Sequence, residues 1–170
     1  MAGTEIFGKE ELAAVQDVIE RKMIHRYGSH GARKGIYRVE EFENRAREIT
    51  GSRHALAVAN GTAALIVALK GIGIRPGDEV ITSPFTFIAT VEAIVACNAV
   101  PIFGDIDETM SLDPSSAERL INERTRAIMP VHMFGAAADM DRFTELGKKY
   151  GIPVIEDACE VVGGTYKGRM

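Results

Sequence analysis

The chain has 170 residues, of which 46% are hydrophobic and 26% are charged, and its formal net charge at pH 7 is −4. These values are typical of a globular protein with a sizeable core, and they fit one domain or one large fragment of a bigger domain. The negative charge argues against nucleic acid and anionic membranes as partners, and the apolar runs are shorter than the ~20 residues that a membrane span needs. Because the first residues show no signal-peptide pattern, we expect a cytoplasmic protein with neither nucleic acid nor membrane as a partner.

The first part of the chain is predicted to be helical. Apolar residues recur at helical spacing over residues 10–23 and again over residues 39–49. Three glycines in residues 28–35 break the first helix, and Gly51-Ser52 ends the second. We therefore predict an N-terminal helical segment over residues 1–50.

From residue 51 onward, short apolar strands alternate with helices. The predicted strands are residues 54–59, 79–82, 99–104, 126–131 and 152–156, and the predicted helices are residues 62–72, 85–97, 114–122 and 139–150. Strands that are apolar on both faces and alternate with helices are typical of a parallel sheet covered by helices. We predict a three-layer α/β/α domain over residues 51–170, with a mainly parallel sheet.

The last residues, Thr165–Met170, resemble a strand that enters a Lys-Gly turn and begins to return. A hairpin needs a second strand to pair with the first, and that strand is missing here. The alternative is a disordered tail. We favour a truncated chain, so the predicted α/β domain is incomplete.

The two cysteines and the histidine at position 132 do not form a metal-binding pattern. Two cysteines are too few for a disulfide framework, and the apolar sequence around Cys97 and Cys159 favours buried, unreactive thiols. His132 follows a predicted strand but has no second His or Cys at ligand spacing, so we expect no metal. It is either a polar contact at the sheet edge or a structural histidine.

The tetrapeptide Asn60-Gly61-Thr62-Ala63 lies where an apolar run becomes a helix. Unpaired N–H groups and the helix dipole make such a turn suitable for an anion, and a glycine lets the backbone approach a ligand closely. The alternative is a simple helix cap, for which Asn and Thr are favoured.

Two carboxylates, Glu156 and Asp157, follow the last predicted strand. Strand side chains alternate, so the two acids point in opposite directions, and ligands of parallel sheets bind at this end of the strands. Asp157 is a candidate partner for a ring N–H⁺ or a metal, with a solvated strand end as the alternative. Two aromatics, Phe85 and Phe87, follow another strand, and one of them is a candidate for stacking on a flat ring, with core packing as the alternative that holds for most Phe pairs. An anion site and a buried acid together suggest a phosphorylated cofactor that is positively charged at its other end.

Several spaced blocks, in order, resemble the DegT/DnrJ/EryC1/StrS family of pyridoxal-phosphate-dependent (PLP-dependent) sugar aminotransferases. The blocks are Val39–Glu43, Ala59–Leu65, Pro76–Ile81, Phe85–Thr90, Phe103–Asp107, Val131–Gly135, Ala138–Met140 and Ile155–Ala158. The resemblance implies the large domain of fold-type-I aminotransferases and a homodimer with active sites at the subunit interface. It implies transfer of an amino group, typically from glutamate, to a keto group of a nucleotide-linked sugar, in the biosynthesis of cell-surface polysaccharides or secondary metabolites.

The resemblance also implies roles for individual residues. Gly61, Thr62 and Ala63 would bind the cofactor phosphate. At the other end, Phe87 would stack on the pyridine ring, Asp157 would keep the ring nitrogen protonated, and Ala158 would pack near the opposite face.

Two positions depart from the family pattern. Glu160 stands where many members have a glutamine near the 3-hydroxyl of the ring. The Schiff-base lysine of the family lies downstream of the Glu-Asp block, and the chain stops at Met170 before that segment. Because Lys167 does not match the motif, we assign no catalytic residue and expect the isolated chain not to transaminate.

Three alternatives stay open from the sequence. Some relatives are PLP-dependent sugar dehydratases with histidine in place of the lysine, and others are proposed to be non-catalytic binding or regulatory modules. A dehydrogenase is disfavoured because the glycine-rich stretch 71–77 lacks the dinucleotide-binding spacing.

Overall fold

A computed structural model describes residues 4–26, 28 and 30–170. The chain divides into two compact units, Met1–Leu56 and Ala57–Met170. The domain limit that we placed after residue 50 stays a prediction. Among the residues that the structure describes, no helix has both the length and the apolar character that a membrane crossing requires.

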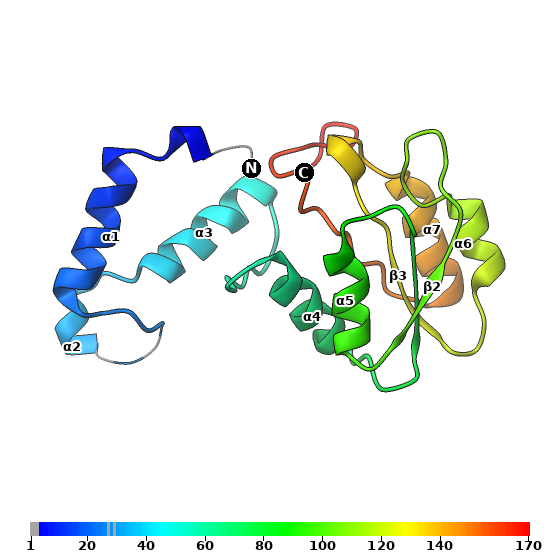
Figure 1. The fold of residues 1–170 in the computed structure, drawn as a ribbon, viewed down its shortest axis with the longest axis horizontal. Helices are drawn as coiled ribbons and strands as arrows, with labels where there is room; N and C mark the ends of the chain where they lie inside the picture. The colour runs from blue at the N-terminus through cyan, green and yellow to red at the C-terminus, as the bar shows by residue number, and fades with distance from the viewer. Residues whose placement is uncertain (1–3, 27, 29) are drawn as a thin grey trace. The chain divides into compact units, whose positions relative to one another are not determined.

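The first unit is helical, as predicted (Figure 1). Its elements are the short 3-10 helix η1 (Thr4–Ile6), α1 (Lys9–Arg21), α2 (His30–Arg33) and α3 (Arg38–Thr50). The carboxylate of Glu11 accepts a hydrogen bond from the N–H of Gly8 at 2.7 Å, and this contact satisfies a backbone donor at the start of α1. The glycine-containing break between the two long helices includes the single helical turn α2, which the sequence did not indicate.

The second unit contains a parallel sheet, which confirms the predicted fold class. Its elements are α4 (Gly61–Gly71), β1 (Glu79–Thr82), α5 (Ile88–Ala96), β2 (Val100–Phe103), α6 (Pro114–Leu120), β3 (Thr125–Met129), the 3-10 turn η2 (Met133–Gly135) and α7 (Met140–Tyr150). The strand order is β2-β1-β3, and both pairings are parallel.

Helices cover both faces of this sheet. On one face, Leu69 of α4 and Ile94 of α5 pack with Val80 of β1 in one buried cluster. On the other face, Phe143 of α7 packs with Ile81 of β1 in a second cluster, to which α6 also contributes. Because neighbouring residues of β1 enter opposite clusters, the sheet is the middle of three layers.

The predicted strand over residues 54–59 is wrong. The structure assigns no strand to this segment, and the side chains of Leu56 and Val58 are exposed. The apolar run suggested burial, but a strand needs a hydrogen-bonded partner, and no described strand pairs with this segment.

The predicted strand over residues 152–156 is only partly formed. Two isolated parallel bridges join it to the β3 region, Ile128 with Val154 and Val131 with Asp157. Hydrogen bonds run from the N–H of Ile155 to the carbonyl of Ile128 and from the N–H of Asp157 to the carbonyl of Pro130. Pro130 lacks an N–H group and cannot return a bond, so the ladder is interrupted between the two bridges.

The predicted Lys-Gly turn near the end of the chain is confirmed. Tyr166 and Arg169 form an antiparallel bridge across the two-residue turn Lys167-Gly168. Both turn residues have positive φ angles, 51° and 78°, which is the conformation that two-residue hairpin turns favour.

A buried glutamate lies at the start of β1, at the sheet edge opposite the carboxyl ends of the strands. The side chain of Glu79 accepts hydrogen bonds from Asn122 Nδ2 at 2.7 Å and from Arg124 Nε at 2.6 Å. The bond from Asn122, and after it the Arg124 guanidinium, hold the pKa of Glu79 below its ordinary value against the opposing effect of burial.

We expect Glu79→Gln to lower the free energy of unfolding at pH 7 by about 1–2 kcal/mol, because charge-assisted hydrogen bonds are lost. The folded-state pKa is below the unfolded one, so this stabilisation is complete above the unfolded pKa of about 4.3 and is lost as the pH falls through the folded value. Urea unfolding over a series of pH values below 7 should therefore show the difference between the two proteins shrinking once the pH falls below about 4.3. The exposed Glu123→Gln is the control, and a difference that does not change with pH would contradict this assignment.

Candidate functional site

The carboxyl ends of β1, β3 and the 154–157 segment lie at one edge of the sheet because all of them run parallel. Asp157 lies at this edge and is only 4% exposed. Its Oδ2 accepts a hydrogen bond from the Thr90 hydroxyl at 2.7 Å, and its Oδ1 accepts a weaker one from the Cys159 N–H at 3.3 Å. Among the described residues no cation forms an ion pair with Asp157, so a ligand's cation would supply the charge that a buried carboxylate needs.

The neighbouring carboxylate points elsewhere, as strand alternation predicts. Glu156 is half exposed, and its Oε2 lies 3.0 Å from His132 Nε2. The N–H of Ala138 donates to His132 Nδ1 at 3.1 Å, so Nδ1 carries no proton and Nε2 is the donor to Glu156. His132 is thus a structural histidine with both ring nitrogens satisfied.

The predicted anion-binding turn is the N-terminus of α4. Asn60 is the helix cap, and its Oδ1 accepts a hydrogen bond from the N–H of Ala63 at 2.8 Å. This bond occupies one of the N–H groups that the sequence offered to an anion. The N–H groups of Gly61 and Thr62 have no acceptor in the described part of the chain. The cap and the anion site are therefore compatible, because they use different donors.

A close contact brings the two halves of the candidate site together. A Cβ atom placed on Gly61 would lie 2.9 Å from the Sγ of Cys159, a distance that real Cβ atoms essentially never show. Cys159 is two residues after Asp157, so the turn that opens α4 touches the segment that follows the buried carboxylate. A side chain at position 61 would therefore fit only if the side chain of Cys159 moved or were smaller.

The prediction of a buried thiol holds for Cys97 but is wrong for Cys159, which is exposed as a residue. It lies in a loop beyond the last strand, where apolar neighbours in sequence do not form core. Local burial of the thiol, reinforced by the hydrogen bond to Asp157 and the charge of that carboxylate, nevertheless raises the pKa of Cys159 to about 11.

Phe87, the candidate for ring stacking, lies immediately before α5. Its side chain is 70% exposed, so the alternative of core packing is wrong for this residue. Ala158, which would pack near the other ring face, is also exposed.

Glu160 has a partner that the sequence did not indicate. Its Oε2 accepts a hydrogen bond from the N–H of Phe134 at 2.8 Å. Phe134 has a positive φ of 50°, and its ring meets that of Phe85 edge to face at 6.0 Å. Glu160 therefore fixes the turn after β3, and a contact with a ring hydroxyl stays a prediction.

Sequence reasoning missed Thr90, which donates to Asp157. Thr90 is 1% exposed and lies in α5, a helix that is otherwise mostly apolar. The sequence signal for this contact is that Thr90 is the single hydroxyl residue of α5 and lies three residues after Phe87.

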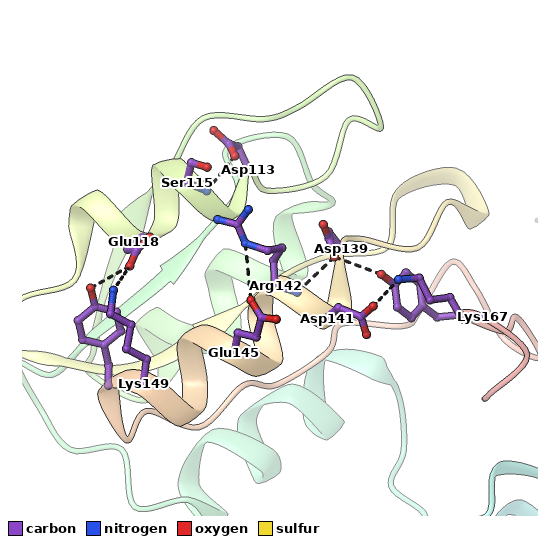
Figure 2. Close-up of polar contacts among 11 residues, drawn as sticks. Asp113, Ser115, Glu118, Asp139, Asp141, Arg142, Glu145, Lys149 and Lys167 are labelled. Carbon is purple, nitrogen blue, oxygen red and sulfur yellow. Dashed lines mark hydrogen bonds and ion pairs between the residues drawn. The ribbon is translucent and has the colours of Figure 1, made fainter.

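Lys167 forms an ion pair with a residue at the start of α7, as Figure 2 shows. Its Nζ pairs with the carboxylate of Asp141, and the neighbouring Tyr166 hydroxyl donates to Asp139 Oδ1 at 3.1 Å. These contacts give Lys167 a structural role in docking the terminal turn. In the described residues, no cluster of three or more His, Cys, Asp and Glu side chains is arranged to hold a metal ion.

Comparisons with known proteins agree with this geometry. The model of the DegT/DnrJ/EryC1/StrS aminotransferase family matches residues 5–170. The chain is 42% identical to the spore coat polysaccharide biosynthesis protein SpsC of Bacillus subtilis, covering 97% of this chain and 40% of that protein. It is 41% identical to the UDP-2-acetamido-2-deoxy-3-oxo-D-glucuronate aminotransferase of Pseudomonas aeruginosa, covering 95% of this chain and 45% of that protein.

A solved structure supports the same relationship. The crystal structure of NtdA from Bacillus subtilis, with bound cofactor PMP, superposes with a TM-score of 0.81 at 33% identity, over 95% of this chain and 36% of that one. The chain spans less than half the length of the curated relatives that it matches. Because the family model matches residues 5–170, which is nearly the whole chain, the chain belongs to the DegT/DnrJ/EryC1/StrS aminotransferase family.

Proposed function

We propose that the protein is a PLP-dependent aminotransferase that moves an amino group from an amino acid, most simply glutamate, to the keto group of a nucleotide-linked sugar. The observation that carries the proposal is the buried Asp157 carboxylate, which has no counter-ion among the described residues and lies beside the α4 turn through the Gly61–Cys159 contact. The names of the Pseudomonas relative, an aminotransferase of a UDP-linked oxo sugar, and of the PMP-bound NtdA support it.

The residues present fit the two ends of this cofactor. The N–H groups of Gly61 and Thr62, which meet no acceptor among the residues that the structure describes, suit a phosphate together with the positive end of α4. Asp157 suits the protonated ring nitrogen, because a carboxylate only accepts hydrogen bonds and no cation among the described residues forms an ion pair with this one. The exposed ring of Phe87 is available to stack.

When bound, PLP supplies an electron sink for the chemistry at the carbon next to the amino group. The contribution of this chain is to bind and orient the cofactor and to keep a proton on its ring nitrogen through Asp157. We assign no lysine of this chain to the proton transfers, since Lys167 is held by Asp141.

We further propose that the protein is a homodimer. The apolar side chains Leu12, Val15 and Ile19 recur at helical spacing on α1, and all three are exposed. A helix face of this kind normally lies against another apolar surface, and a second copy would supply one. The cytoplasmic location stays a prediction.

We expect the chain to bind pyridoxamine 5′-phosphate, a probe that avoids non-specific condensation with lysines, and Asp157→Asn to weaken binding about 10- to 100-fold. Loss of one charge-assisted bond is worth about 1.5–3 kcal/mol, which corresponds to this range. Isothermal titration calorimetry would measure the affinity, and Asp141→Asn is the control that should bind like the wild type. Pyridoxamine without its phosphate should bind more weakly, as the α4 turn predicts.

The result that would overturn the proposal is equally clear. Absence of binding by the wild-type chain, or equal affinity of the wild type and Asp157→Asn, would favour a non-catalytic module that has kept the fold.

We expect Cys159 to react with iodoacetamide at pH 8 about 100-fold more slowly than a thiol of ordinary pKa 9.0, because only the thiolate reacts and its pKa is raised to about 11. The rate should rise about tenfold per pH unit up to that value. Site-resolved mass spectrometry separates Cys159 from the buried Cys97. Asp157→Asn should accelerate the reaction, and a wild-type rate at pH 8 equal to that in urea would show that the thiol is not perturbed.

A further inference from the structure

Two threonine hydroxyl groups form a chain of hydrogen bonds that ends at the buried carboxylate of Asp157. The Thr90 Oγ1 lies 2.7 Å from Asp157 Oδ2, and the Thr86 Oγ1 lies 2.7 Å from the Thr90 Oγ1. Thr90 is almost completely buried and Thr86 is partly buried. No role in the site follows for either residue from the cofactor contacts proposed above.

The direction of these hydrogen bonds follows from the charge of Asp157. An ionised carboxylate has no proton to give, so the Thr90 hydroxyl must donate its single proton to Asp157. The Thr90 oxygen then acts as the acceptor of the second bond, and Thr86 is the donor. Two donors in series polarise one another, and this strengthens the bond that reaches the carboxylate.

The location of the pair in the fold adds to the argument. Thr86 and Thr90 lie on either side of Phe87, and the N–H of Thr90 donates to the carbonyl of Phe87 at 3.2 Å. The first turn of α5 therefore holds both the exposed ring of Phe87 and the hydroxyl that contacts Asp157. One rigid turn links the residue proposed to stack on the cofactor ring with the residue proposed to bind its nitrogen.

Asp157 depends on this contact because its other partners are weak. The bond from the backbone N–H of Cys159 is long at 3.3 Å, the Cys159 thiol is a weak donor, and the described residues offer no ion pair. A buried carboxylate that loses its best donor is less favourable as an ion.

We propose that Thr90, supported by Thr86, is a positioning residue that fixes the orientation of the Asp157 side chain, so that this carboxylate can keep the cofactor's ring nitrogen protonated. The inference rests on the proposed function and deepens it. Thr90 acts through Asp157 and does not itself touch the cofactor.

The test compares two buried threonines. Thr90→Val removes the hydroxyl that reaches Asp157, whereas Thr82→Val removes an equally buried hydroxyl that donates to the carbonyl of Met129 at 2.8 Å. Thr90→Ser keeps the hydroxyl and serves as the rescue, and Thr86→Val removes only the outer donor. Each protein is titrated with pyridoxamine 5′-phosphate labelled with ¹⁵N in the ring, and the ¹⁵N resonance reports whether the ring nitrogen is protonated.

We expect Thr90→Val to weaken binding about tenfold or more and to move the ¹⁵N resonance toward that of the unprotonated ring. Thr90→Ser and Thr82→Val should keep the wild-type resonance, and Thr86→Val should show a smaller change in the same direction. If Thr90→Val fails to fold, Thr86→Val against Thr82→Val decides the question.

The outcomes separate this inference from the proposed function. A wild type that binds, Asp157→Asn that binds more weakly, and Thr90→Val with wild-type affinity and resonance would overturn the role of Thr90 alone. A wild type that does not bind the probe would overturn both.

Discussion

The burial of one carboxylate constrains most of the second unit. Backbone hydrogen bonds that join residues 155–157 to the β3 region place Asp157 at the carboxyl ends of the strands. Its side chain accepts a hydrogen bond from the Thr90 hydroxyl of α5. A carboxylate costs free energy when it leaves water, and this protein offsets that cost with neutral donors from Thr90 and Cys159 and no cation from the described residues. This is the environment that the proposed cofactor contact requires.

Burial of this charge also explains why residues from distant parts of the sequence must meet. The hydroxyl donor comes from the first turn of α5, the amides proposed to bind an anion come from the start of α4, and the side chain of Cys159 lies against Gly61. These elements are adjacent because α4 and α5 pack on the same face of the sheet. The three-layer core is thus what gives the site its geometry.

Much of this arrangement was accessible from the sequence. The parallel sheet, its covering helices and the opposite directions of Glu156 and Asp157 follow from hydrophobic period and strand alternation. The strand expected at residues 54–59 was wrong because an apolar run does not reveal whether a pairing partner exists. Predicting the interruption opposite Pro130 would have required the register of two strands. Predicting the Thr90 contact would have required the packing of a helix against a strand end. Both are long-range properties that a single sequence does not reveal. Cys159 was misjudged for the same reason, since its apolar neighbours belong to a loop.

The Gly61–Cys159 contact has a consequence for how this site can change. The two positions share one small volume, so the sum of their side-chain sizes is limited while neither size is fixed alone. A larger residue at the α4 turn would have to be accompanied by a smaller one after Asp157. Redesign of the α4 turn should therefore vary both positions together. A residue other than glycine at position 61 would fit where position 159 carries a side chain smaller than cysteine.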